Sequence, residues 1–294
     1  MTTMSENLER LETSIAAACR KAGRARSEVE LMAVSKTYPA AIIAEAASLG
    51  LRLFGENRVQ EFAGKFPDLE PLRHFLNARP NRLPQTYGQC PETHGQCHEV
   101  SGHDFSRAEE RSNLEGALAP EVSSPSLIPS RFHLIGHLQS NKAVRAAELF
   151  DAIDSVDSLR IAERLNEAAG KLGKHLPILI EVKLSPEDTK AGLDPDSLEA
   201  AQLLERLPDL ENLHTRGLMT IAPWGVTEEV TRNCFRDLRE WRDRWSAAHP
   251  QLAFDVLSMG MSGDFPLAIE EGATRIRVGT ALFGKRKPYA GPEE

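Results

Sequence analysis

Strand-like and helix-like segments alternate along most of the chain, and this alternation restricts its fold more than any other feature. Eight short runs have the apolar, β-branched composition of strands. They cover residues 29–35, 51–54, 131–135, 152–155, 177–182, 214–219, 254–257 and 274–278. The run at 177–182, PILIEV, is almost continuously apolar, which is typical of a parallel strand buried on both faces.

Helical periodicity fills the intervals between these runs. The predicted helices cover 39–50, 57–66, 140–149, 158–172, 195–207, 228–248 and 265–272, and one more amphipathic helix precedes the first strand. A helix between successive strands favours a parallel sheet with right-handed crossovers. Eight such units predict an α/β fold, a single (β/α)8 TIM barrel with an extra N-terminal helix. A doubly wound open sheet is the alternative, although its glycine-rich first turn is absent at Ser35-Lys36-Thr37.

Residues 67–130 interrupt the alternation. This stretch is rich in Pro, Gly, Ser and His and has no sustained periodicity, so we expect a disordered insert between the second helix and the third strand. In a barrel such a connection lies on the face opposite the carboxyl ends of the strands. Residue types that bind zinc occur within it, but their spacing matches no closed zinc site, and no metal is predicted. They are Cys90, His94, Cys97, His98 and His103.

Composition excludes several classes of function. The formal net charge of −8 gives no basic field for nucleic acid. Four cysteines in 294 residues are too few for a disulfide framework, which indicates a reducing compartment. No apolar run approaches the roughly 20 residues of a membrane span, and the N-terminus has no secretory signal. We therefore expect a cytoplasmic protein without a nucleic-acid or membrane partner.

The loops after the last two strands have the composition of a phosphate site. Barrel enzymes commonly bind phosphate between these two loops, where small residues let backbone N–H groups approach the oxygens. Gly260, Ser262 and Gly263 follow the seventh strand, and Gly279 and Thr280 follow the eighth. The alternative is that these are ordinary turn residues, with Ser262 or Asp264 capping a helix.

Lys36 ends the first strand, which places it at the same mouth of the barrel. Burial lowers the pKa of an amine, and the neutral amine is the form that attacks an aldehyde. A rim lysine paired with Glu56 is the alternative. Together, a lysine and a phosphate site are what an aldehyde-bearing phosphate cofactor requires.

Arg277 lies two residues before Gly279, so strand alternation directs both toward the same side. A guanidinium keeps its proton, and against a pyridine nitrogen it would keep that nitrogen unprotonated. A phosphate ligand, or an ion pair with Glu181, is the other interpretation. The sequence leaves both open.

Several short motifs follow one another along the chain. They lie at 32–37 (MAVSKT), 54–57 (FGEN), 133–139 (HLIGHLQ), 141–142 (NK), 217–219 (GLM), 257–264 (LSMGMSGD) and 277–284 (RVGTALFG). In this order they resemble the motifs of the pyridoxal phosphate homeostasis proteins. The resemblance covers nearly all of the chain except about 67–130, where family members have a much shorter connection.

The resemblance implies a fold-type III barrel, like the N-terminal domain of alanine racemase. It implies that Lys36 carries pyridoxal 5′-phosphate (PLP) as a Schiff base and that Arg277 faces the pyridine nitrogen. It assigns the phosphate to Ser262, Gly279 and Thr280. Residues implied to line the cofactor pocket are Asn57, His133, Met219 and Ser258. The family is associated with vitamin B6 homeostasis and has no firmly established catalytic activity.

Racemisation on PLP needs an acid or base on each face of the adduct, and Lys36 could serve only one. Alanine racemases supply the other with a tyrosine from a C-terminal β-domain. Here ten residues follow Gly284, with Tyr289 in a tail that has the composition of a frayed end. We therefore expect a monomer that holds and releases PLP, has no catalytic residue, and has apo PLP-dependent enzymes as possible partners. A weak amino-acid racemase or other PLP enzyme is the alternative, and a PLP-independent interaction module is a third hypothesis.

Overall fold

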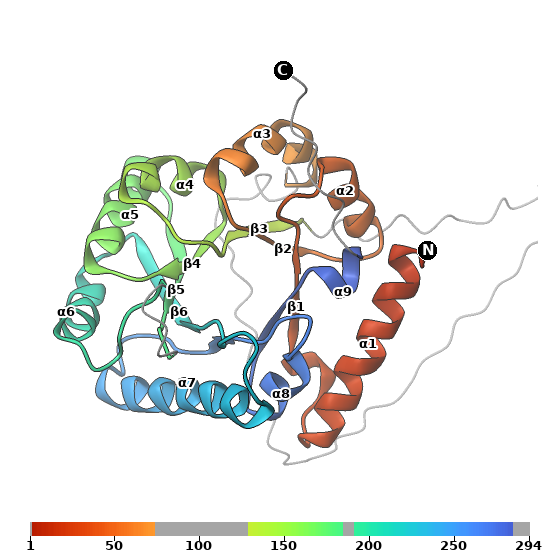
Figure 1. Ribbon diagram of the computed structural model, residues 1–294. Coiled ribbons are helices and arrows are strands. Elements are labelled where there is room, and N and C mark those ends of the chain that lie inside the picture. The colour runs from red at the N-terminus through yellow and green to blue at the C-terminus, as the bar shows by residue number, and fades with distance from the viewer. Residues whose placement is uncertain (1, 74–128, 185–190, 285–294) are drawn as a thin grey trace, which may run out of the picture.

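The computed structural model describes residues 2–73, 129–184 and 191–284. Within them, eight parallel strands form a closed barrel in which each strand pairs with the next in sequence and the last pairs with the first. Figure 1 shows the helices as a ring around these strands. The predicted (β/α)8 barrel is confirmed, and the open doubly wound sheet is wrong.

The strands lie close to the predicted runs, although β2 and β7 begin two residues later than predicted. Where a strand begins depends on its pairing with neighbouring strands, which composition alone does not predict. The strands are β1 (Glu30–Val34), β2 (Leu53–Glu56), β3 (Arg131–Leu134), β4 (Ala152–Val156), β5 (Leu176–Glu181), β6 (Leu213–Met219), β7 (Val256–Ser258) and β8 (Arg275–Val278).

The helices cover the outside of the barrel. They are α1 (Met4–Lys21), α2 (Ala40–Ser48), α3 (Val59–Leu69), α4 (Ala143–Leu149), α5 (Leu159–Lys171), α6 (Leu198–Arg206), α7 (Glu228–Ala248), α8 (Phe265–Glu270) and α9 (Thr280–Phe283). The predicted N-terminal helix is α1, which packs on α8 and α9 (Figure 1). The short α9 follows β8 directly and was not predicted.

Side chains alternate between the outside and the inside of the barrel. Leu31 and Ala33 of β1 belong to the main core beneath the helices, whereas Met32 and Val34 belong to a separate apolar cluster with Leu53 and Ile135. This division follows from the two-residue period of a strand. The main core stabilises the barrel wall, and the inward positions hold the smaller apolar cluster together with buried polar groups such as Glu181 and Arg277.

The helix after β2 extends beyond its predicted end at residue 66. Pro67 suggested the end, but α3 continues to Leu69, which is fully buried, and a 3-10 helix follows at Glu70–Leu72. The predicted insert therefore does not begin at residue 67, and residues 74–128 of it lie outside the described residues. The Ser130 N–H donates to the Leu72 carbonyl at 3.1 Å, so the chain enters and leaves the segment at one place.

Candidate functional site

Lys36 occupies a tight turn directly after β1. The Tyr38 N–H donates to the Ser35 carbonyl at 3.1 Å, which closes a four-residue turn with Lys36 and Thr37 at its centre. Thr37 has a φ of +69°, the conformation that a type II turn requires at its third position. Lys36 is half-buried in this turn, two residues beyond the end of β1 at the carboxyl end of the barrel.

The loop after β8 lies against this end of β1. A Cβ atom added to Gly279 would be 3.3 Å from the carbonyl oxygen of Val34, two residues before Lys36. The close approach favours glycine, because a side chain would force the two segments apart. The structure thus brings the predicted phosphate loop beside the predicted cofactor lysine.

The loop after β7 joins the same region through Ser262. The Ser262 hydroxyl accepts a hydrogen bond from the Ala281 N–H at 3.3 Å, which links this loop to the first turn of α9. Asp264 accepts from the Met261 N–H at 2.5 Å and makes no capping bond to α8. Neither side chain caps α8, so that alternative is wrong for Asp264, whereas Ser262 does bond the first turn of α9. The first turn of a helix has N–H groups without intrahelical acceptors, so the start of α9 offers donors for an anion.

Gly260 shapes the loop after β7. Its φ is +91°, and a Cβ atom there would be 2.6 Å from the Cβ of Ala268 on α8. Glycine permits both the left-handed backbone and the close packing. The loop therefore turns sharply at the barrel mouth before α8 begins.

Arg277 lies inside the barrel and is 4% exposed. Its guanidinium donates to the carbonyl (2.6 Å) and hydroxyl (2.9 Å) of Ser258 and to the Thr220 carbonyl at 2.7 Å. Among the described residues it makes no ion pair with Glu181, so that interpretation is wrong. Burial lowers the pKa of Arg277, and nearby carboxylates oppose the shift. The side chain is held rigidly at the strand ends, where it can face a ligand.

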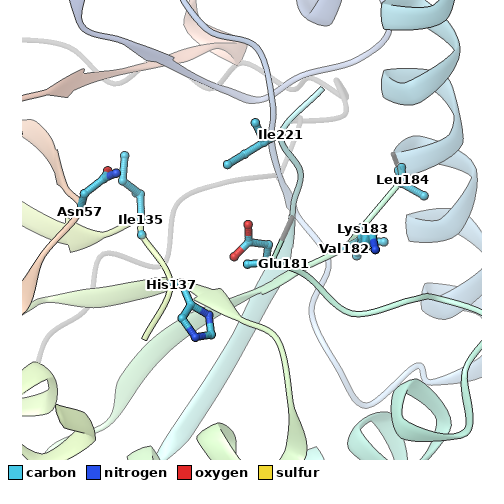
Figure 2. A pocket seen from close by; sticks show the side chains of 10 residues that line it. Asn57, Ile135, His137, Glu181, Val182, Lys183, Leu184 and Ile221 are labelled. Carbon is cyan, nitrogen blue, oxygen red and sulfur yellow. The ribbon is translucent and has the colours of Figure 1, made fainter. Parts of the chain in front are cut away.

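Glu181 ends β5 and points into a cavity of about 230 Å³ at the barrel mouth. Figure 2 shows its carboxylate directed into the space between Asn57 and Ile135 on one side and Ile221 on the other. Glu181 is 4% exposed, and no described residue makes a hydrogen bond to its Oε2. Burial, followed by repulsion from Asp157, raises its pKa to about 7. A buried polar oxygen without a hydrogen bond is costly, so this oxygen is a candidate contact for a ligand in the cavity.

Strand register places three inward residues side by side. Glu181 pairs with Met219 across β5 and β6, and Met219 pairs with Ser258 across β6 and β7. Met219 and Ser258 are fully buried, and Asn57 lines the same cavity as Glu181. Three of the four residues predicted to line a pocket therefore lie at one end of the barrel.

His133 lies deeper in the barrel. It is on β3, two residues before Ile135, and its Nδ1 is 3.0 Å from Oδ1 of the buried Asp154. The residues that line the cavity here come after the end of β3; they are Ile135, Gly136 and His137. A cofactor contact for His133 remains a prediction.

Glu56 is occupied by partners other than Lys36. Its Oε1 accepts from the Ser35 hydroxyl at 2.7 Å and lies 3.3 Å from Nζ of Lys65 on α3. The rim pairing of Lys36 with Glu56 is thus replaced by a pairing with Lys65. Burial raises the pKa of Glu56, although Lys65 and Ser35 oppose the shift.

The comparisons with known proteins cover almost the whole chain. The family described as alanine racemase, N-terminal domain, matches residues 7–287. The pyridoxal phosphate homeostasis protein of Vibrio cholerae is 37% identical over 287 residues, which cover 97% of this chain and 98% of the relative. Its counterpart in Escherichia coli K12 is 34% identical, with the same two coverages. This chain belongs to the pyridoxal phosphate homeostasis family.

Solved structures agree with this membership. PipY of Synechococcus elongatus PCC7942, solved with PLP bound, is 36% identical with a TM-score of 0.69, covering 96% of this chain and all of PipY. An alanine racemase of Clostridium difficile is 15% identical with a TM-score of 0.58, covering 96% of this chain and 57% of the racemase. That second likeness shows a shared barrel fold alone.

Sequence reasoning did not identify Glu181 as a cavity residue, nor Glu61 and Lys65 as neighbours of the Lys36 turn. The signal for Glu181 was present, because it is an acid that ends an almost continuously apolar strand. Glu61 and Lys65 have the four-residue spacing of an ordinary ion pair on a helix surface. That spacing does not indicate a contact with the turn at Lys36.

The Cys and His residues at 90–103 lie outside the described residues. Within the described ranges, no three His, Cys, Asp or Glu side chains gather as metal ligands would. Among the helices that the structure describes, none is long and apolar enough to cross a membrane.

Proposed function

We propose that this chain binds PLP as a Schiff base on Lys36 and holds and releases it in the PLP homeostasis of the cytoplasm. The observation that carries the proposal is the packing of Gly279 against Val34, which brings the loop with phosphate-site composition beside the lysine. Relatives named pyridoxal phosphate homeostasis proteins, and PipY with PLP bound, support it.

The donor set fits a phosphorylated pyridine aldehyde. Ser262, Gly279 and Thr280 would hold the phosphate at the start of α9, where N–H groups and a hydroxyl are available. PLP supplies an aldehyde that condenses with an amine and a ring that withdraws electrons. Asn57, His133, Met219 and Ser258 are the proposed lining of its pocket.

Arg277 favours holding the cofactor over turning over a substrate. A guanidinium keeps its proton, so beside the pyridine nitrogen it would act as a hydrogen-bond donor and leave that nitrogen unprotonated. An unprotonated ring withdraws electrons weakly. Its hydrogen bonds to Ser258 and Thr220 would fix the guanidinium in that orientation.

A weak amino-acid racemase, or another PLP enzyme, is the second candidate. One observation favours it: Glu181 is a cavity carboxyl group whose pKa is raised to about 7, near the value that suits proton transfer at neutral pH. The names of the relatives favour homeostasis instead.

The test begins with the absorption spectrum of the purified protein. We expect the band of a PLP–lysine Schiff base, its fixation to Lys36 by borohydride, and its loss in Lys36→Ala. Lys171→Ala, on the exposed face of α5, should leave the band unchanged. Absence of the band in the native protein at micromolar PLP would exclude the proposal.

A second measurement separates carrier from enzyme. We expect the loaded protein, a monomer by sedimentation, to reactivate an apo PLP-dependent enzyme faster than PLP dissociates into solution. Rapid racemisation of an amino acid that depends on both Lys36 and Glu181 would instead establish the enzyme.

A further inference from the structure

Thr37, next to Lys36, has an unfavourable backbone conformation. Among the described residues it is the only residue other than glycine with a positive φ, +69°. A β-branched residue adopts this conformation at a cost, and it persists only where surrounding contacts impose it. The structure should therefore contain a group that holds Thr37 in place.

Glu61 on α3 is that group. The Thr37 N–H donates to Oε1 of Glu61 at 2.6 Å. Hydrogen bonds to a carboxylate are shorter and stronger than those between neutral groups. Burial alone would raise the pKa of Glu61, but the hydrogen bonds from Lys65 and Thr37 have the larger combined effect. The net result is a lowered pKa. The acceptor is therefore ionised at neutral pH.

Lys65 connects this contact to the other side of Lys36. Its Nζ lies 2.6 Å from Oε1 of Glu61 and 3.3 Å from Oε1 of Glu56, and its side chain is only 13% exposed. Glu56 in turn accepts from the Ser35 hydroxyl. The residues before and after Lys36 are thus anchored to a single cluster outside the barrel wall.

We propose that Glu61 is a positioning residue, which directs the amine of Lys36 by holding Thr37 in the left-handed conformation. The effect on PLP rests on the proposed function, whereas the hold on Thr37 does not. If φ of Thr37 relaxed while β1 and α2 stayed fixed, the peptide between Lys36 and Thr37 would rotate and move the lysine side chain. An amine that must meet one carbon atom in a cavity is sensitive to such a rotation.

The first arm of the test uses protein freed of PLP. Unfolding by urea is measured for the native chain, Glu61→Met, Thr37→Gly and the double variant. Glycine adopts a positive φ without cost, so Glu61→Met should destabilise the Thr37→Gly background clearly less than the native background. An equal loss in both backgrounds would overturn the proposed hold on Thr37.

The second arm measures PLP affinity from the Schiff-base band. We expect Glu61→Met to weaken binding on the order of tenfold or more, as loss of a charge-assisted hydrogen bond predicts. Glu61→Gln keeps an oxygen acceptor for the Thr37 N–H and should retain most of the affinity. Thr37→Gly combined with Glu61→Met should recover part of what Glu61→Met loses.

The control is Glu45→Gln on the exposed face of α2, which should change neither stability nor affinity. A Glu61→Gln variant as weak as Glu61→Met would assign the effect to the ion pair with Lys65 and overturn the proposal. The two arms also separate the failures: an absent Schiff-base band excludes the proposed function, while the unfolding cycle still decides whether Glu61 holds Thr37.

Discussion

Nδ1 of His133 lies 3.0 Å from Oδ1 of Asp154, and both side chains are buried inside the barrel. The other oxygen of Asp154 accepts from Arg275 at 3.0 Å, and Arg275 also pairs with Glu30 of β1. This chain of polar contacts crosses the barrel beneath the cavity. Burial opposes ionisation of Asp154, but His133 and Arg275 prevail and lower its pKa.

Removal of His133 should lower the stability of the fold, whether or not the residue also contacts the cofactor. We expect His133→Ala to lower the free energy of unfolding by roughly 3 kcal/mol, because a buried carboxylate loses one of its partners. A carboxyl group with a lowered pKa stabilises the fold above its unfolded pKa, and this stabilisation is lost as pH falls through the folded pKa. Acid unfolding of His133→Ala should therefore occur at higher pH.

Urea unfolding and an acid titration of the variant test this expectation. His137→Ala is the control, since His137 is exposed and its contact with Asp157 lies at the surface. Loss of the Schiff-base band without loss of stability would instead assign His133 to the cofactor.

Glu181 should make the PLP-free protein less stable at alkaline pH. Its pKa is raised from 4.5 to about 7, so the unfolded chain releases the proton more readily than the folded chain. Its contribution to stability is fully present below pH 4.5 and is lost as pH rises through about 7, with a loss on the order of 3 kcal/mol. We expect Glu181→Gln to raise the melting temperature at pH 8 and to change it little at pH 4. Equal effects at both pH values would contradict the burial of this carboxyl group in the folded protein.

Ser262 should affect the preference for a phosphorylated ligand. Its hydroxyl bonds the Ala281 N–H, so Ser262→Ala removes a hydroxyl from the proposed cradle and frees the start of α9. We expect several-fold weaker binding of PLP and little change for pyridoxal, which lacks the phosphate. Both affinities can be read from the Schiff-base band. An equal loss for the two ligands would place Ser262 away from the phosphate.

The segment between Leu72 and Ser130 should be dispensable for folding. Its ends are joined by the hydrogen bond from the Ser130 N–H to the Leu72 carbonyl. Replacement of residues 75–127 by a short Gly-Ser linker should leave the circular dichroism spectrum and PLP binding unchanged. A shorter loop costs less to close, so stability should rise by on the order of 1 kcal/mol. An unfolded deletion variant would show that the segment contributes to the barrel.

Much of the architecture was readable from local patterns. The helix predicted at 228–248 is α7 (Glu228–Ala248), because Thr227 caps its start and its apolar face keeps a helical period throughout. Errors arose where neighbours decide the boundary. Pro67 indicated a helix end, but the burial of Leu69 keeps α3 intact beyond it.

The site was predicted in part for a similar reason. Lys36, Ser262 and Gly279 follow the carboxyl ends of strands. In any parallel barrel these ends lie at the same mouth, so the three residues were expected to be close together. The depth at which an inward side chain lies in the barrel could not be predicted in this way, because it depends on strand register. His133 lies below the cavity, whereas Glu181 enters it.

By itself the sequence determined the eight strands and the helices between them, the lysine after the first strand and the small residues after the last two. Strand and helix periodicity and the order of motifs are properties of the linear chain. Only the tertiary structure decided that Gly279 packs against Val34 and that Glu61 reaches Thr37. Those contacts join segments distant in sequence, and their geometry depends on barrel closure and helix packing, which no local pattern encodes.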